Sequence, residues 1–345
     1  MTEQKISRTL VNKDATSEAR ELMKYLAEHY GKGVLTGQQD YGNLNWINEN
    51  TGRKPAVIGF DLMEYSPSRT ERGATSEEIR DMIAWHRQGG IVTLCWHWNS
   101  PSNLIDEPGK EWWRGFYTEA TTFDLAAALA HPESDEYALL IRDIDVIAGH
   151  LQELKDVGVP VLFRPLHEAE GGWFWWGAKG PESAKQLYRL MYDRLVNKHE
   201  LGNLIWVWNS EKPEWYPGDD LVDIVSVDVY PEAGNHSPLA ERYENLRELV
   251  NDSKIIALAE NGSIPDPQQM KEQGVHWSWF CTWTGEFLRG GQHNTVDFLK
   301  EVYNSKYVVT LDQLSGVGNS HSNLNCTAHR EPKKALAWHK NLCGC

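Results

Sequence analysis

The chain has 345 residues, of which 41% are hydrophobic and 24% charged, a composition typical of a folded globular protein rather than a disordered or fibrous one. Lysine and arginine number 34 against 49 aspartates and glutamates, which gives a formal net charge of −15. Such an acidic surface repels nucleic-acid phosphates and anionic membranes, so we expect neither as a partner. No apolar run approaches the ~18 residues of a membrane span.

Eight short apolar runs alternate with longer amphipathic segments along most of the chain. The runs are typical of strands buried on both faces, at residues 33–37, 56–61, 91–98, 160–165, 204–208, 224–229, 255–260 and 277–283. Helical patterns separate them at residues 17–29, 76–87, 141–156, 181–198, 239–251, 267–273 and 295–303. This alternation predicts an α/β fold, a single-domain (β/α)8 or TIM barrel.

An open, doubly wound α/β sheet is the alternative fold for this pattern. Such a sheet normally carries a glycine-rich phosphate loop after its first strand. Here the segment 31–33 lies before and at the start of the predicted strand rather than after it, and its two glycines lack the required spacing. We therefore assign residues 1–316 to the barrel, with residues 99–137 as an elaborated loop that contains a short helix near 123–130.

Residues 317–345 form a polar tail that we expect to pack on the barrel or to trail from it. Three of the five cysteines, Cys326, Cys343 and Cys345, lie in this tail and do not fit a zinc spacing well. They predict a small disulfide-bonded structure, which implies an oxidising compartment. The first residues lack an apolar signal stretch. We expect a secreted protein in its mature form, with the signal sequence absent from this chain.

Reactive side chains follow the predicted strands, where a barrel of this kind places its active site. The residues at or just beyond the predicted strand ends include Asp61, His97, His167, Glu168, Asn209, Asp228, Tyr230, Glu260 and Trp283. Strand ends that merely face water would more often carry Gly, Asn or Lys. The concentration of carboxylates, histidines and tryptophans therefore indicates a site, although each residue alone has a structural alternative.

Two glutamates stand nearly opposite each other around the predicted barrel. Glu168 ends the fourth strand and Glu260 the seventh. Glycosidic cleavage needs such a pair, because one carboxyl protonates the leaving oxygen while the other attacks the anomeric carbon or activates water. A separation of ~5–5.5 Å gives retention of configuration, and ~6.5–9.5 Å gives inversion. The alternative is that either glutamate forms an ion pair with Arg164 or His167.

The 16 tryptophans, many of them in clusters, are several-fold more than usual. Their flat faces suit the apolar faces of sugar rings, although each of them could instead pack in the core. At residues 164–177 the sequence RPLHEAEGGWFWWG resembles the acid/base segment of family 26 glycoside hydrolases, best known as endo-β-1,4-mannanases. Segments 96–98, 228–231 and 258–262 agree in order, and the resemblance runs from about residue 33 to 303. Ala169 and Glu170 stand where the family more often has Met and Asn.

The resemblance implies a retaining, endo-acting hydrolase of mannan, glucomannan and galactomannan that needs no metal or cofactor and acts as a monomer. It implies that Glu168 is the general acid/base and Glu260 the nucleophile. It also implies two supporting groups of residues. The residues expected to orient the nucleophile are His167, Asp228 and Tyr230, and those expected to bind substrate are His97, Trp96, Trp112, Trp113, Arg164, Trp173 and Trp283.

Three other functions compete with this interpretation. A metal-dependent hydrolase would need a His-x-His pair at the first strand, which has no histidine. A non-catalytic sugar-binding barrel would be expected to lack one of the two glutamates. Within the family, β-1,3-xylanases and mixed-linkage β-glucanases share the motifs, and the choice depends on whether the site accepts an axial 2-hydroxyl.

Overall fold

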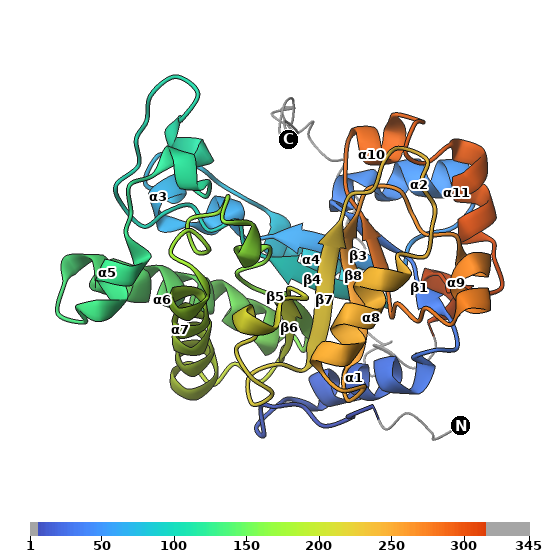
Figure 1. Ribbon diagram of the computed structural model, residues 1–345, viewed down its shortest axis with the longest axis horizontal. Coiled ribbons are helices and arrows are strands. Elements are labelled where there is room, and N and C mark those ends of the chain that lie inside the picture. Colours follow the sequence, from blue (N-terminus) through green and yellow to red (C-terminus); the bar gives the residue numbers. More distant parts are fainter. Residues whose placement is uncertain (1–5, 315–345) are drawn as a thin grey trace, which may run out of the picture.

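In a computed structural model that describes residues 6–314, eight parallel strands close into a barrel (Figure 1). The strands follow one another around the barrel in chain order. They are β2 (Gly37–Gln39), β3 (Val57–Asp61), β4 (Ile91–Cys95), β5 (Val161–Arg164), β6 (Leu204–Asn209), β7 (Ile224–Val229), β8 (Ile255–Asn261) and β9 (Phe280–Thr282). The predicted (β/α)8 fold is confirmed.

Helices surround the barrel, and each predicted helix has a counterpart. They are α1 (Ser17–His29), α2 (Leu44–Thr51), α3 (Pro67–Thr70), α4 (Glu78–Arg87), α5 (Leu125–Ala130), α6 (Asp135–Asp156), α7 (Pro181–Tyr192), α8 (Ala240–Leu249), α9 (Pro267–Gln273), α10 (Glu286–Arg289) and α11 (Val296–Tyr303). The predicted helix at 181–198 changes to a wider π-helical segment, Asp193–Lys198, after α7. Short helix α5 lies in the elaborated loop, as expected.

Helix α1 closes the amino-terminal end of the barrel (Figure 1). Its buried Leu22 and Leu26 belong to the same apolar cluster as Val57, Ile91 and Ile205 from the strands. The side chain of Thr16 caps the helix by accepting a hydrogen bond from the Ala19 N–H. With this end filled by apolar side chains, the carboxyl ends of the strands are left for chemistry.

The first predicted strand, 33–37, is in fact divided between two sheets. Its first part, β1 (Val34–Leu35), pairs with β10 (Val308–Val309) outside the barrel. The barrel strand β2 begins at Gly37, where a Cβ would lie 2.1 Å from the carbonyl oxygen of Phe280 on β9. Glycine is required there because β2 and β9 approach closely where the barrel closes.

Helix α4 begins at Glu78, two residues later than predicted. The Ser76 hydroxyl still accepts a hydrogen bond from the Glu78 N–H at 3.2 Å, but from outside the helix. The Glu78 carboxylate turns inward and accepts the Asp61 N–H at 2.7 Å. Two predicted strands are also shorter than expected, because β4 ends at Cys95 and β9 contains only Phe280–Thr282.

The predicted tail at 317–345, with its three cysteines and their disulfide bonding, lies outside the described residues. Within residues 6–314, Cys95 and Cys281 are buried and free. In the same part of the chain, no helix is long and apolar enough to cross a membrane. Secretion stays a prediction.

Candidate active site

The paired carboxylates lie at the carboxyl ends of the strands. Glu260 is on β8, and Asp228 on β7 is its partner in the strand register, next to an irregularity after Val227. Glu168 lies in the segment that follows β5. One carboxylate oxygen from each of Glu168, Asp228 and Glu260 lies within 4.8 Å of the others. The structure therefore brings the two predicted glutamates together at a separation that suits retention rather than inversion.

Glu260 is buried and held by two donors. The Arg164 guanidinium forms an ion pair with one of its oxygens, and the Tyr230 hydroxyl donates to the other at 2.6 Å. Arg164 also donates to Asp228 at 2.5 Å, and Asp228 accepts the side-chain amide of Asn209 at 2.9 Å. These contacts fix the orientation of the Glu260 carboxylate, which an attacking group requires.

Glu168 has different surroundings. Burial, together with the negative charge of Glu260, raises the pKa of Glu168 to about 7. The Trp173 indole N–H donates to its Oε2 at 2.9 Å and opposes that rise. The backbone N–H of Glu168 donates to Asn209 Oδ1 at 2.9 Å. Glu168 is thus mostly protonated below neutral pH, which a general acid requires.

Arg164 and Trp96 do not occupy the positions predicted for substrate binding. Arg164 is buried and its guanidinium is engaged by Asp228 and Glu260, so it holds these two carboxylates in place. Trp96 is only 1% exposed, its ring stacks on Trp98, and its indole N–H donates to Ser66 at 3.0 Å. Trp96 is a core residue and not a sugar platform.

His167 does not contact the nucleophile as predicted, and within residues 6–314 no hydrogen bond joins it to Glu260. Its Nε2 instead faces Nε2 of His97 at 3.2 Å, and its carbonyl accepts the Trp176 indole N–H at 2.9 Å. Of the three residues predicted to orient Glu260, Tyr230 contacts it directly, and Asp228 acts through Arg164.

The aromatic candidates differ in how available their ring faces are. Trp173 is 49% exposed beside Glu168, and Trp113 is 40% exposed in the loop after β4. Trp112 packs under two guanidinium groups, with ring centroids 5.8 and 5.7 Å from the Cζ atoms of Arg69 and Arg72. Trp113 is therefore better placed than Trp112 to stack on a sugar.

Trp283 and His97 lie close together, with ring centroids 6.3 Å apart. Trp283 is partly buried just beyond β9, where its backbone N–H donates to the Asn261 carbonyl oxygen. Both ring nitrogens of His97 already have partners, Asp61 at Nδ1 and His167 at Nε2. The predicted hydrogen bond from His97 to a sugar therefore requires one of these contacts to break.

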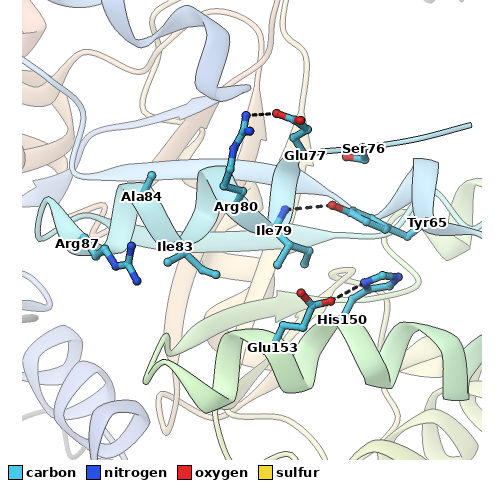
Figure 2. Close-up of a pocket in the computed structure, with 10 residues that line it drawn as sticks. All are labelled: Tyr65, Ser76, Glu77, Ile79, Arg80, Ile83, Ala84, Arg87, His150 and Glu153. Atoms are coloured by element: carbon cyan, nitrogen blue, oxygen red, sulfur yellow. Dashed lines mark hydrogen bonds and ion pairs between the residues drawn. The ribbon is translucent and has the colours of Figure 1, made fainter. Parts of the chain in front are cut away.

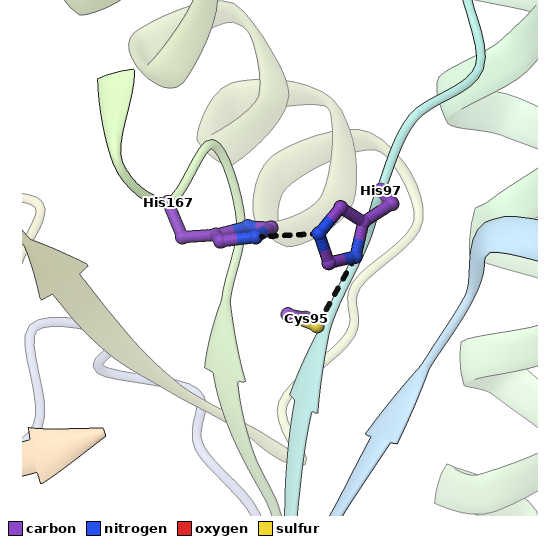
Figure 3. Close-up of side chains that lie close together, drawn as sticks. All are labelled: Cys95, His97 and His167. Atoms are coloured by element: carbon purple, nitrogen blue, oxygen red, sulfur yellow. Dashed lines mark hydrogen bonds between the residues drawn. The ribbon is translucent and has the colours of Figure 1, made fainter. Parts of the chain in front are cut away.

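Two groups of side chains bring together atoms that metals bind. Cys95, His97 and His167 offer ligand atoms within 4.8 Å of one another (Figure 3). Burial raises the pKa of the Cys95 thiol well above its ordinary value, and both His97 nitrogens are engaged. In the carboxylate group, Arg164 already pairs with Asp228 and Glu260. Neither group needs a metal to balance its charge.

A surface hollow of about 540 Å³ lies apart from these residues, between α4 and α6 (Figure 2). Its walls include Ile83 and Arg80 from α4, and His150 and Glu153 from α6. A hydrogen bond within α6, between His150 and Glu153 at 3.0 Å, already joins two of its polar groups. The hollow contains neither Glu168 nor Glu260 and is not part of the candidate active site.

Two residues of the site were missed among the predicted site residues, although both lie at predicted strand ends. Asp61 ends β3 and binds His97, and Asn209 ends β6 and binds both Glu168 and Asp228. Their position at the carboxyl end of a strand was the available signal. What the sequence lacked was any indication of which neighbour each would bind.

Comparison with known proteins identifies the family to which this chain belongs. Residues 11–313 match the model of a family described as glycosyl hydrolase family 26. The chain belongs to this family. The recognised acid/base segment at 164–177 lies within the matched region, which extends beyond the resemblance expected from the motifs at both ends.

Family 26 relatives agree in sequence and in structure. The chain is 51% identical over 314 residues to a mannan endo-1,4-beta-mannosidase of Thermothelomyces thermophilus, covering 91% of this chain and 65% of that protein. It is 36% identical over 321 residues to mannan endo-1,4-beta-mannosidase A of a Piromyces species, covering 90% of this chain and 51% of that one. The chain thus spans about half to two thirds of the length of these curated relatives.

Solved structures of the family superpose closely on this fold. A GH26-CBM35 β-(1,4)-mannanase of Podospora anserina gives a TM-score of 0.89 at 51% identity, over 90% of this chain and 70% of that one. A β-mannanase from a symbiotic protist of the termite Reticulitermes speratus, complexed with a gluco-manno-oligosaccharide, gives 0.83 at 31% identity, over 91% of this chain and 100% of that one.

Proposed function

We propose that this chain is a retaining endo-β-1,4-mannanase that hydrolyses internal bonds of mannan, glucomannan and galactomannan. The observation that carries the proposal is the pair of glutamates, whose oxygens lie within 4.8 Å and whose surroundings differ as an acid and a nucleophile require. The names of the relatives support the substrate. Those curated relatives are longer than this chain, so we propose the activity for the barrel that the chain shares with them.

In the first step, the Glu260 carboxylate attacks the anomeric carbon while the bond from that carbon to the leaving oxygen breaks. Glu168 gives its proton to the leaving oxygen. The products are a shortened polysaccharide and a glycosyl ester on Glu260. Arg164 and Tyr230 hold the attacking carboxylate in place.

In the second step, the ester has removed the negative charge of Glu260, which had helped to raise the pKa of Glu168. Glu168 is now a carboxylate and takes a proton from water. The resulting hydroxide equivalent attacks the anomeric carbon and breaks the ester bond. Two inversions restore the original configuration, and both glutamates return to their starting states.

Product analysis on four polysaccharides, incubated side by side, tests the proposal. Mannan, glucomannan, β-1,3-xylan and mixed-linkage β-glucan are each treated with the chain and with the Glu168→Gln/Glu260→Gln variant as control. We expect ladders of oligosaccharides from mannan and glucomannan with the unaltered chain alone. Cleavage of only xylan or mixed-linkage glucan would contradict the substrate, and binding without cleavage would favour a non-catalytic sugar-binding barrel.

A further inference from the structure

Two histidines beside the catalytic pair share a hydrogen bond that the mechanism above does not use. Nε2 of His97 and Nε2 of His167 face each other at 3.2 Å (Figure 3). A neutral imidazole carries one N–H, so one of these nitrogens must donate and the other must accept. The pair alone does not decide which one donates.

The contacts of both Asp61 oxygens determine which of the two Nε2 atoms donates. Oδ1 accepts the backbone N–H groups of Met63 and His97, each at 2.9 Å. Oδ2 lies 2.6 Å from Nδ1 of His97. A carboxylate only accepts, so Nδ1 of His97 carries the hydrogen. In a neutral pair, Nε2 of His97 is then the acceptor and Nε2 of His167 the donor.

Protonation of the pair is opposed by the surroundings of His167. A second proton would put a hydrogen on Nδ1 of His167, which is buried without a partner, and a buried unpaired donor is rarer than an unpaired acceptor. Burial, His97 and Arg164 also lower the pKa of His167 well below its ordinary value. Burial opposes the charge on His97 too, although Asp61 outweighs it and raises the pKa of His97.

The charged and titratable groups around the pair come from several strands. They are Asp61 on β3, Cys95 on β4, Arg164 on β5, Glu168 after β5 and Glu260 on β8. The three acids favour a proton on the pair, whereas Arg164 opposes it. The orphaned Nδ1 of His167 adds to the opposition, so the neutral pair is the state that satisfies the geometry.

His167 lies in the strained segment that carries the general acid. Its neighbours Leu166 and Glu168 have φ values of 55° and 53°, in the left-handed region that side chains other than glycine adopt at a cost. The segment is held by Asn209 at the Glu168 N–H, by Trp176 at the His167 carbonyl, and by the bond between the two imidazoles. Of these three hydrogen bonds, only the one between the two imidazoles has a donor and an acceptor that depend on a further residue.

We propose that Asp61 is a positioning residue that sets the tautomers of His97 and His167 and thereby holds the Glu168 segment in its working geometry. Asp61 acts through the two rings and contacts no reacting atom. The tautomers follow from the hydrogen bonds alone, and only the kinetic consequence rests on the proposed function.

The Asp61→Asn variant should reverse the direction of the hydrogen-bonded chain. Its Oδ1 must remain an oxygen, because two backbone N–H groups donate to it, so its amide nitrogen faces His97 and donates. His97 then donates from Nε2, and His167 carries its hydrogen on the orphaned Nδ1. We expect kcat on mannan to fall by about 10–100-fold, with KM changed by less than about threefold. The variant displaces the general acid Glu168 but does not remove a contact that binds the sugar.

Nitrogen-15 NMR of the imidazoles in the whole chain tests the tautomers directly, at a pH where both rings are neutral. The His97→Gln and His167→Gln variants assign the signals. We expect hydrogen on Nδ1 of His97 and on Nε2 of His167, and the reverse in Asp61→Asn. Hydrogen on Nδ1 of His167 in the unaltered chain would overturn the proposal, and this measurement does not require the variant to fold.

A double-mutant cycle tests the link to catalysis. Glutamine at position 167 can turn either its amide or its carbonyl toward His97 and leaves no orphaned ring N–H. Asp61→Asn should therefore reduce kcat by less than about threefold in the His167→Gln background. An equal loss in both backgrounds would overturn the proposal.

The control is Asp143→Asn, a buried carboxylate that accepts the Trp98 indole N–H at 2.9 Å outside the pair. We expect it to leave the His97 and His167 signals unchanged, and the same reversal in this variant would overturn the assignment to Asp61. If the unaltered chain does not cleave mannan, the proposed function fails, while the NMR spectra still decide the tautomers.

Discussion

Glu168 and Glu260 carry the same side chain, and the different roles proposed for them depend on their neighbours. Glu260 lies against the Arg164 guanidinium and the Tyr230 hydroxyl, which favour a negative charge. For Glu168, burial and then the negative charge of Glu260 raise the pKa to about 7. The direction of proton transfer is therefore set by position in the barrel and not by residue type.

Azide rescue distinguishes the two roles. In Glu260→Ala the nucleophile is missing, so azide can attack an activated β-mannoside directly and give the inverted, α-configured azide. In Glu168→Ala the glycosyl ester still forms, and azide attacks it to give the β-configured product. We expect each variant to lose at least about 10²-fold in turnover of mannan without azide. NMR of the azide adducts checks the outcome, and swapped configurations would reverse the two roles.

Trp173 should tune the alkaline side of the pH profile. Its indole N–H stabilises the charged form of Glu168, so Trp173→Phe should raise the pKa of Glu168 further above its ordinary value. The acid then stays protonated to higher pH, and the fall in kcat/KM near pH 7 should move upward by a few tenths to about one unit. The pH dependence of kcat/KM measures this shift.

Trp113→Phe is the matched control for Trp173→Phe, because Trp113 is exposed to a similar degree and has no hydrogen bond to Glu168. It should leave the alkaline side of the profile in place. A downward or absent shift in Trp173→Phe would show that the indole does not stabilise the carboxylate.

At the scale of single residues, the sequence predicts which two glutamates lie together but not the neighbours of each side chain. Glu168 and Glu260 could be predicted because the ends of parallel strands meet. Trp96 was misplaced because one residue decides whether a side chain near a strand end points inward or outward. The contacts of Arg164 and His167 could not be predicted, because the partners of Arg164 lie on β7 and β8 and that of His167 lies just after β4, far away in the sequence.

Among the elements, the strands deviate from prediction where the barrel closes. Hydrophobic runs predict where a strand can form, but hydrogen bonding decides where it ends. Residues 33–37 are apolar enough for one strand, yet the first part pairs with β10 and the second with β3 and β9. No local pattern marks that division except Gly37, whose missing side chain permits the approach of Phe280.

Gly37→Ala should therefore destabilise the fold. The new Cβ meets the backbone of β9, which cannot move without disturbing the barrel, so we expect a loss of about 1–3 kcal/mol in the free energy of unfolding. Urea denaturation measures it.

Gly149→Ala makes the same chemical change at an exposed position of helix α6, where the added Cβ meets no atom within 4 Å. It should increase the free energy of unfolding by about 0.5–1 kcal/mol. Similar effects of the two substitutions would contradict the close approach of β2 and β9.

For the molecule as a whole, alternation of strands and helices was enough to predict the barrel. Eight buried strands with intervening helices have few other compact arrangements, and an open sheet lacked its phosphate loop. Closure then brings Asp61, Asn209 and Glu260 to one end, although they are far apart in the chain. The contacts among them depend on the register around the ring, which hydrophobic periodicity does not encode.

The configuration of the first product tests the central claim most directly. Proton NMR during the earliest turnover of a manno-oligosaccharide shows whether the new reducing end is β or α before the two forms equilibrate. Paired oxygens within 4.8 Å leave room for a covalent glycosyl ester but not for an attacking water between them, so the β form should appear first. An initial α product would contradict the assignment of Glu260 as the nucleophile.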